Sequence, residues 1–240
     1  MLLPPRYLLR EHVVVGVLEA LGARSVAEVG CGAGEILVAL EGKGLTGVGY
    51  DVSAQARAHA RRRLSEADCK GFVISEAWPS PGVFDVVLLL EVLGYADDPV
   101  ALLTRCRDLL RPHGHVVLSY ARSGAGYDPR IVAGMRFYDR DQVTNLLEQA
   151  GFVDVRQINY GFPLANLLVG LNNLAYRVRL ARRGRPLEVE DTGLVYSSNL
   201  LRPLGLVSNR LVLTPFFAIQ RLFSATNLGN GYVVCAKAVG

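Results

Sequence analysis

The sequence predicts an α/β fold in which helices cover a central, mainly parallel sheet. Short apolar runs alternate with helical patterns over the first two-thirds of the chain, and a glycine-rich turn follows the first run. Half of the 240 residues are hydrophobic and a fifth are charged. Such alternation is typical of strand–helix–strand units. A chain of this length can bury one substantial core and is short for two.

Strands are expected where short apolar runs are bounded by glycine, proline or charged residues. They are Ser25–Gly30, Gly47–Val52, Gly71–Ser75, Phe84–Leu90, His115–Tyr120, Val153–Ile158 and Tyr232–Val239. Helical spacing predicts the covering helices Glu35–Gly42, Ala54–Ala67, Pro99–Leu110 and Asp139–Ala150. Residues 110–114 are expected to end a helix and turn into the fifth strand, because proline and glycine interrupt helices.

The alternation stops after residue 158, and about seventy residues precede the last strand. Apolar residues at helical spacing predict an amphipathic helix on Leu164, Leu167, Leu168, Leu171, Ala175 and Val178, and Leu211–Phe223 predicts a second. Residues 160–231 carry eight arginines and three acidic residues, so the net charge of +4 leaves about −1 for the rest. We expect an N-terminal helical segment (1–24), a core (25–159 and 232–240) and a helical cap inserted at 160–231.

Several classes of protein are disfavoured. The N-terminus has prolines and charges where a secretory signal needs an apolar run. The cysteines Cys31, Cys69, Cys106 and Cys235 are scattered, so neither a disulfide framework nor a metal site is predicted. Gln157–Tyr176 is uncharged but contains four asparagines and a proline, which are costly in hydrocarbon. We therefore expect a cytoplasmic protein without a membrane span.

The strongest chemical signal is the turn that follows the first strand and includes Gly30, Gly32 and Gly34. Glycines let the backbone turn tightly and let a ligand approach without a Cβ in the way. The helix that starts there presents unpaired N–H groups. Asp51 ends the second strand, where a carboxylate can accept both hydroxyls of a ribose. Together these features predict a nucleoside site on a doubly wound sheet.

Acidic residues around the turn indicate which nucleoside binds. The third glycine of a dinucleotide fingerprint would fall at Glu35, and a carboxylate beside a pyrophosphate is unfavourable. Glu28, ahead of the first glycine, suits a ligand with an ammonium group. S-adenosylmethionine has an ammonium and a sulfonium and no phosphate, so it is the predicted cofactor. A nicotinamide-dependent oxidoreductase and a non-catalytic S-adenosylmethionine-binding protein are the alternatives.

These motifs resemble the class I S-adenosylmethionine-dependent methyltransferases, particularly the small-molecule group that includes ubiquinone-biosynthesis methyltransferases. Residues 28–34 resemble the first motif, 47–53 the second-strand motif and 84–99 the fourth-strand motif, while 109–115 resemble the turn before the fifth strand. The resemblance covers roughly residues 20–158 and 232–239. It implies a doubly wound, Rossmann-like seven-stranded sheet of order 3-2-1-4-5-7-6 with an antiparallel last strand.

The resemblance also implies a cofactor site. Asp51 would hold the ribose, Val52 would pack on adenine, and Leu90 would lie beside the methionine end. Glu76 and Ala77 fall where the family usually has an Asp-Ala pair beside the adenine amino group. The full predicted set is Glu28, Gly30, Cys31, Gly32, Gly34, Asp51, Val52, Glu76, Ala77, Leu90 and Glu91. Cys31 is expected to fit the turn as a small residue.

Catalysis needs few side chains if the methyl group is already activated on a sulfonium, because alignment of the reacting atoms supplies much of the rate. A general base is needed only if the acceptor must lose a proton. Tyr95, Tyr138 and Tyr160 are the predicted candidates, and Tyr120 and Tyr127 also fall near the expected methyl group. For each, a packed aromatic side chain is the competing interpretation. Many relatives carry a histidine where this chain has Tyr95, so no histidine base is predicted, and no metal is expected.

Three segments could cover the site and select the acceptor: the helix around Arg6, Tyr7 and Arg10, the loop 122–138, and the insertion 160–231. An apolar cap with arginines suits a small, partly hydrophobic acceptor that bears a carboxylate or phosphate, or one presented on an acidic carrier protein, as in secondary metabolism. O-, N- and C-methylation stay open. A solvated arginine face and peripheral membrane contact are alternatives. Nucleic acid is disfavoured, because no recognition motif accompanies the basic segment.

Overall fold

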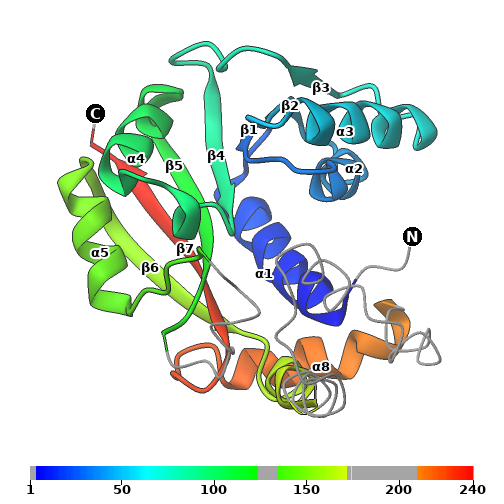
Figure 1. The fold of residues 1–240 in the computed structure, drawn as a ribbon, viewed down its shortest axis with the longest axis vertical. Coiled ribbons are helices and arrows are strands. Elements are labelled where there is room, and N and C mark those ends of the chain that lie inside the picture. Colours follow the sequence, from blue (N-terminus) through cyan, green and yellow to red (C-terminus); the bar gives the residue numbers. More distant parts are fainter. Residues whose placement is uncertain (1–3, 124–133, 172–173, 175–209, 240) are drawn as a thin grey trace, which may run out of the picture.

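The computed structural model describes residues 4–123, 134–171, 174 and 210–239. Its centre is a seven-stranded sheet of order β3-β2-β1-β4-β5-β7-β6 (Figure 1). The strands are β1 (Ser25–Val29), β2 (Thr46–Tyr50), β3 (Phe72–Ser75), β4 (Phe84–Leu90), β5 (Leu110–Ala121), β6 (Phe152–Tyr160) and β7 (Gly231–Ala238). β1 to β5 pair in parallel, and β7 is antiparallel to both β5 and β6. The predicted sheet order and the antiparallel last strand are confirmed.

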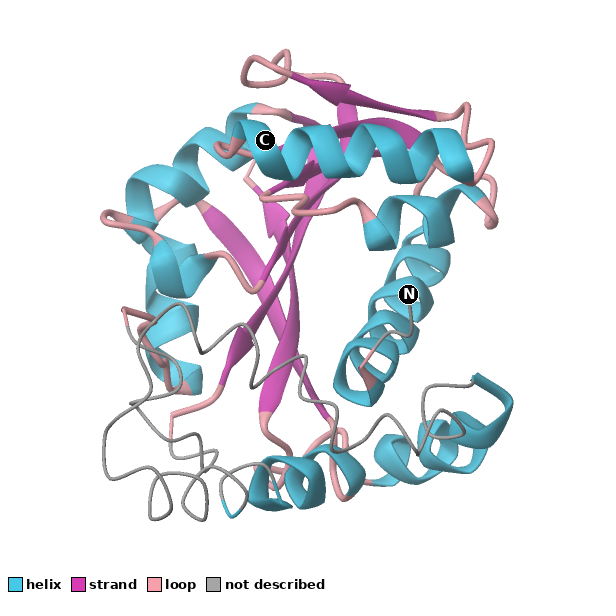
Figure 2. Ribbon diagram, turned by 45° about the vertical axis from the view of Figure 1, so that its right-hand side comes forward, coloured by secondary structure: helices cyan, strands magenta, loops and turns pink. Residues whose placement is uncertain are grey.

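The described helices flank this sheet on both faces (Figure 2). They include α1 (Pro5–Leu21), α2 (Glu35–Glu41), α3 (Ala54–Glu66), α4 (Pro99–Asp108), α5 (Arg140–Gln149) and α8 (Arg210–Leu222), with a 3-10 turn η1 at Leu93–Tyr95. Side chains cap three of the helices: Ser53 caps α3, Asp98 caps α4, and Asp139 forms a capping box with Gln142 at α5. These caps satisfy backbone N–H groups that the first helical turn leaves unpaired.

Two buried layers hold the sheet between the helices. Along β4, Val87 and Leu89 pack with α4 and α5, whereas Val86 and Leu88 pack with α1, α2 and α3. Side chains alternate between the faces of a strand, and both faces are covered, so the strand is apolar throughout. This accounts for the continuous apolar run of residues 86–90.

The fifth strand starts earlier than expected. β5 begins at Leu110, which pairs with Phe84, and the ladder then shifts register before Val86 pairs with His115. The shift spans the proline-glycine segment, and His113 has a left-handed backbone with φ +63°. Proline has no N–H to donate to a ladder, so the segment forms an irregularity inside the strand and not a separate turn.

The described part of the insertion is helical and rests on α1. Residues 164–171 form a helix, and α8 matches the second predicted cap helix. A buried apolar cluster joins both to α1: Leu8, Leu9, Leu164, Ala165 and Leu213. Both helices lie at the lower end of the molecule in Figures 1 and 2. Val178, Tyr127 and the arginines at 177–185 lie outside the described residues.

Among the described residues, no helix combines the length and apolarity needed to cross a bilayer. All four cysteines are free thiols.

Candidate active site

The glycine-rich turn joins the carboxyl ends of β1 and β2. The backbone N–H groups of Gly30 and Cys31 donate to the carbonyl of Tyr50, at 2.7 and 2.9 Å. Gly30 and Gly32 have left-handed backbones, with φ +78° and +52°. A Cβ on Gly30 would lie 2.3 Å from Val92 Cγ2, whereas one on Gly32 would point into open space. Gly30 is therefore needed for packing, and Gly32 leaves room for a ligand above the turn.

Asp51 follows β2 and faces this turn. Its Oδ2 accepts from the Gly32 N–H and its Oδ1 from the Ser53 N–H, both at 2.9 Å. These two bonds fix the carboxylate, and its oxygens keep further lone pairs. The group can therefore accept hydrogen bonds from a pair of ligand hydroxyls.

A cavity of about 640 Å³ lies beside Asp51 and is lined by Val52, Leu90 and Trp78, among others. Trp78 meets Tyr50 edge to face with ring centroids 5.4 Å apart, and the Arg105 guanidinium lies 4.0 Å from the Trp78 ring centroid. Flat apolar and aromatic walls next to a hydroxyl-binding carboxylate suit a nucleoside.

A second cavity of about 330 Å³ lies on the other side of Gly30, where α1 approaches the turn. Its walls include Tyr7 and Arg10 of α1 and Glu28 of β1. Three atoms of these residues are buried without a hydrogen-bond partner among the described residues: Tyr7 Oη, Arg10 Nε and Glu28 Oε2. Burial raises the pKa of Glu28 to about 8. Buried polar atoms without partners cost free energy, so this set fits a ligand with a cationic and an anionic group.

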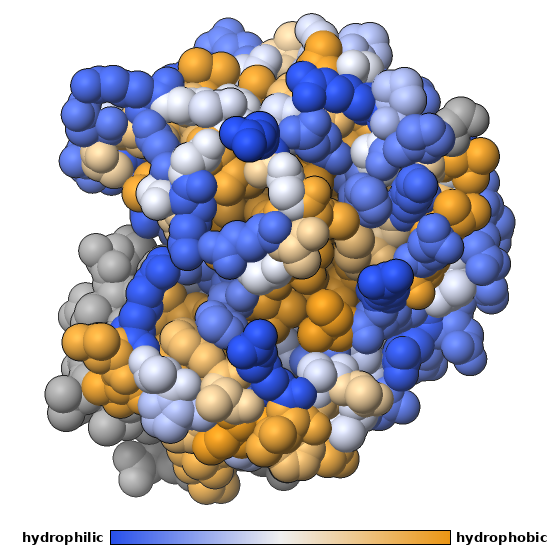
Figure 3. Space-filling model, turned by 180° about the vertical axis from the view of Figure 1, so that it is seen from behind, coloured by the Kyte–Doolittle hydropathy of each residue, from blue (hydrophilic) through white to orange (hydrophobic). Residues whose placement is uncertain are grey.

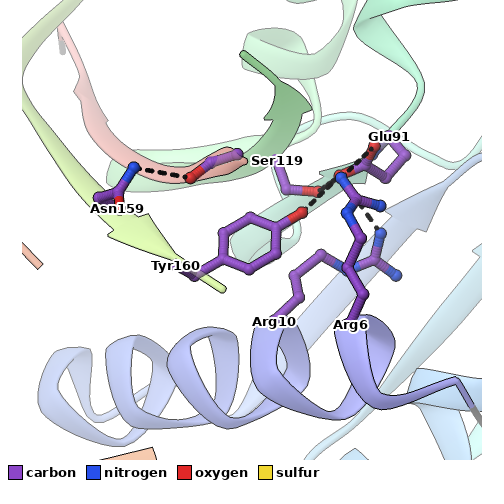
Figure 4. A network of polar contacts seen from close by, with 7 residues as sticks. Arg6, Arg10, Glu91, Ser119, Asn159 and Tyr160 are labelled. Atoms are coloured by element: carbon purple, nitrogen blue, oxygen red, sulfur yellow. Dashed lines mark hydrogen bonds and ion pairs between the residues drawn. The ribbon is translucent and has the colours of Figure 1, made fainter. Parts of the chain in front are cut away.

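Glu91 lies between the two cavities and lines both of them. Figure 4 shows Arg6 and Arg10 reaching it from α1, with Tyr160 and Ser119 nearby. Glu91 Oε1 accepts from Arg6 Nη2 at 3.2 Å, from Tyr160 Oη at 3.0 Å and from Ser119 Oγ at 3.2 Å, and Arg10 Nη1 lies 3.5 Å away. Burial raises its pKa, but Arg6 and then Arg10 outweigh this and lower it to about 2. Glu91 is therefore ionised and holds the arginines of α1.

The structure brings together most of the predicted cofactor residues. Those that line one cavity or both are Glu28, Gly30, Cys31, Gly32, Asp51, Val52, Leu90 and Glu91. Gly34 instead packs against Ala60, where a Cβ would come within 3.2 Å. Glu76 and Ala77 line neither cavity, and Glu76 is exposed and accepts from Arg61 Nη2 at 2.9 Å. The roles of these residues toward a cofactor stay predictions.

The sequence motifs do not single out Trp78 or Arg105. Trp78 directly follows Ala77 and is the only tryptophan of the chain, which is the signal that could have indicated it. Tyr7 and Arg10, on the helix expected to help cover the site, line the smaller cavity with Glu28.

The three candidate tyrosines have different surroundings. Tyr95 is 61 % exposed and lines the larger cavity. Tyr138 is buried and its hydroxyl donates to the Leu93 carbonyl at 3.3 Å. Tyr160 is fully buried and donates to Glu91. Of the three, Tyr95 is the one that lines one of the two cavities described above. Within the described residues, no three or more His, Cys, Asp or Glu side chains are grouped to hold a metal ion.

Comparison with known proteins gives related sequences. The model of a methyltransferase domain matches residues 18–157. The ubiquinone biosynthesis O-methyltransferase of Dinoroseobacter shibae is 33 % identical over 150 residues, which cover 54 % of this chain and 60 % of that protein. The one of Thiobacillus denitrificans is 36 % identical over 104 residues, covering 41 % and 45 %. The chain thus spans about half the length of the curated relatives it matches.

Solved structures share the fold. Phosphoethanolamine N-methyltransferase 2 of Haemonchus contortus, in complex with S-adenosylmethionine, has a TM-score of 0.59 at 17 % identity, covering 94 % of this chain and 52 % of that one. The cyclase SpnF has a TM-score of 0.58 at 15 % identity, covering 96 % and 82 %. Because the domain model matches more than half of the residues, the resemblance to class I S-adenosylmethionine-dependent methyltransferases is confirmed, and the chain belongs to the methyltransferase domain family.

Proposed function

We propose that this protein transfers a methyl group from S-adenosylmethionine to a small, partly hydrophobic acceptor. The observation that carries the proposal is the pair of cavities that share Gly30, Leu90 and Glu91. The larger one offers Asp51 and flat walls for adenosine. The smaller one offers unpartnered polar atoms of both charge types for the methionine portion.

Each residue then has a defined task. S-adenosylmethionine supplies an activated methyl group when bound. Asp51 accepts from the ribose hydroxyls, and Trp78 contacts the adenine. Glu28 accepts from the ammonium, and Arg10 donates to the carboxylate. Tyr95, which lines the larger cavity and is largely exposed, is the candidate to relay a proton from the acceptor to solvent. The main contribution of the protein is alignment of the reacting atoms.

The composition of the insertion and the names of the relatives support one class of acceptor. In the described part of 160–231, Arg210 and Arg221 are the charged residues, and no residue is acidic. Apolar side chains of the cap pack on α1. These features support a hydrophobic acceptor with a carboxylate or phosphate, free or on an acidic carrier protein. The names of the relatives favour oxygen as the methylated atom and a biosynthetic role.

Peripheral membrane contact is a second proposal, for the outer face of the cap. Figure 3 shows hydrophobic residues gathered along the lower edge of the molecule, the end where α8 lies. Exposed apolar side chains of the cap are Leu167, Leu171, Leu174, Leu211 and Leu222. An apolar face with one exposed arginine, Arg221, that is not paired with Glu11, and no described acidic residue, favours an anionic lipid surface. Sedimentation with anionic but not with zwitterionic vesicles is expected, and no sedimentation with either would contradict it.

The two alternative functions, a nicotinamide-dependent oxidoreductase and a non-catalytic S-adenosylmethionine-binding protein, have less support. Glu35 pairs with Arg63 at 3.1 Å, at the position where a dinucleotide site needs a glycine, and the chain belongs to a methyltransferase family. The fold alone does not decide between methyl transfer and binding of the cofactor without transfer, because a fold does not fix a reaction. The cyclase SpnF, for example, shares this fold.

Two measurements test the proposal. Calorimetry should show binding of S-adenosylmethionine and S-adenosylhomocysteine but not of NAD. Asp51→Ala should weaken this binding about 10- to 150-fold, which corresponds to about 1.5–3 kcal/mol for hydrogen bonds to a charged group. Ser53→Ala is the matched control, because it removes the cap of α3 and keeps the Asp51 carboxylate. Unchanged affinity of Asp51→Ala would refute the ribose assignment.

Turnover separates the enzyme from the non-catalytic alternative. S-adenosylmethionine is incubated with a panel of hydrophobic hydroxy-, amino- and carboxyl-bearing acceptors, and S-adenosylhomocysteine is quantified. We expect formation with at least one hydroxyl acceptor. Binding without product across the panel would favour the non-catalytic alternative.

A further inference from the structure

We propose that Gln220 and the Glu11–Arg210 pair are positioning residues, through which the cap sets the affinity for the cofactor. They hold α1 against α8, so that Tyr7 and Arg10 stay directed into the smaller cavity. This inference rests on the proposed assignment of that cavity to the methionine portion of S-adenosylmethionine.

Gln220 joins three elements through one buried side chain. It lies on α8 and is 2 % exposed. Its Nε2 donates to the Leu9 carbonyl of α1 at 3.2 Å, and its Oε1 accepts from the N–H of Gly161, directly after β6, at 3.3 Å. Both ends of a buried amide are thus satisfied, which fixes the distance and orientation of α1 relative to the sheet and the cap.

Two further contacts join the same helices. Arg210 Nη2, at the first residue of α8, pairs with Oε1 of the buried Glu11. The His12 ring stacks on Phe217 of α8, with centroids 4.4 Å apart and an interplanar angle of 8°. Burial raises the pKa of Glu11, and Arg210 and Arg10 offset this only in part. These contacts together fix how α1 packs against α8.

The cavity-facing residues of α1 alternate along the helix with these contacts. Tyr7 and Arg10 lie within one helical turn of Leu9 and Glu11, on a helix that runs without interruption from Pro5 to Leu21. A displacement of this rigid helix moves Tyr7 and Arg10 together. Since binding groups must be held within about 0.5 Å of their productive positions, loss of the α8 contacts should weaken ligand binding at a distance.

A pair of ligands isolates this effect. S-adenosylhomocysteine carries the amino-acid portion, whereas 5′-methylthioadenosine has the adenosine without it. In Arg210→Gln and Gln220→Leu, we expect S-adenosylhomocysteine to bind about tenfold more weakly, within the range typical of coupled sites, with 5′-methylthioadenosine affinity unchanged. A merely structural role would weaken both ligands equally. Equal loss, or wild-type affinity for S-adenosylhomocysteine in both variants, would overturn the inference.

Matched variants complete the experiment. Arg62→Gln removes the same charge from an exposed side chain of α3 and should bind like wild type. Glu11→Gln combined with Arg210→Gln replaces the ion pair by two amides and should recover most of the affinity. Arg210 is 60 % exposed, so its variant keeps the test valid if Gln220→Leu does not fold. A wild-type protein that binds neither ligand would instead refute the proposed function, and this inference with it.

Discussion

Glu28 is buried and Glu91 is partly buried beside the same cavity, yet the pKa values of the two carboxyl groups shift in opposite directions. Burial raises the pKa of Glu28 to about 8, because Arg10 only partly compensates for it. Burial also acts on Glu91, but Arg6 and Arg10 lower that pKa to about 2. At neutral pH the first is largely protonated without a cationic ligand and the second is ionised. One carboxyl is thus available for a ligand, and the other orders the arginines of α1.

The raised pKa of Glu28 predicts pH-dependent binding. An ammonium favours the ionised carboxylate, so binding below pH 8 must release the proton from Glu28. Affinity for S-adenosylhomocysteine should therefore rise between pH 5.5 and 7, by up to about tenfold per pH unit. Calorimetry in buffers of different ionisation enthalpy should report the released proton. In Glu28→Gln the dependence should disappear. A flat profile in the wild type would show that Glu28 does not meet the ammonium.

The lowered pKa of Glu91 predicts acid sensitivity of the fold. Its contribution to stability is complete above the unfolded pKa of about 4.5 and is lost as pH falls toward about 2. Glu91→Gln should destabilise the protein by about 3 kcal/mol at pH 7, because Arg6 and Arg10 lose the carboxylate that pairs with them. Urea unfolding at pH 7 and near pH 3 should show the difference from wild type shrinking. A constant difference would contradict the linkage.

At the scale of elements, α1 serves three neighbours at once. Val14 and Leu18 pack under the sheet, Tyr7 and Arg10 line the smaller cavity, and Glu11 meets α8. A helix that precedes the first strand thus links the cofactor side to the cap. The proposed coupling between cap and cofactor is a consequence of this position.

The interface between α8 and α1 should contribute measurably to stability. Leu213 is fully buried in it, whereas Leu211, two residues earlier on the same helix, is 80 % exposed. Leu213→Ala should lower the free energy of unfolding by about 2–4 kcal/mol, as expected for a buried leucine. Leu211→Ala, the matched control, should change it by less than about 0.5 kcal/mol. Equal effects in urea unfolding would mean that α8 does not fold with the core.

At the scale of the whole molecule, the site draws on segments far apart in the chain. α1, the turn after β1, the end of β2, Trp78 and the end of β4 each supply walls of the two cavities. A ligand that bridges them should stabilise the entire fold.

Thermal unfolding tests this expectation. S-adenosylhomocysteine at a hundred times its Kd should add about 2.7 kcal/mol of stability, which corresponds to a rise in Tm of several degrees. NAD should produce no shift. A shift with NAD and none with S-adenosylhomocysteine would favour the oxidoreductase alternative.

Much of the fold follows from local pattern. The strand and helix positions follow from periodicity and caps, because these depend on neighbouring residues. The sheet order was implied by the family resemblance. The site around Gly30 and Asp51 can also be predicted from the sequence, because the ends of adjacent parallel strands meet at one edge of the sheet. The early start of β5 cannot be predicted in this way, because Leu110 extends the strand only through pairing with Phe84.

The sequence by itself therefore determined the layered sheet, the glycine turn and the carboxylates beside it. Only the tertiary structure decided that Arg6 and Arg10 hold Glu91, that Trp78 and not Glu76 lines the larger cavity, and that Gln220 ties α8 to Leu9. These contacts join residues up to 211 positions apart. Their geometry depends on which helix face meets the sheet, and no local periodicity encodes that choice.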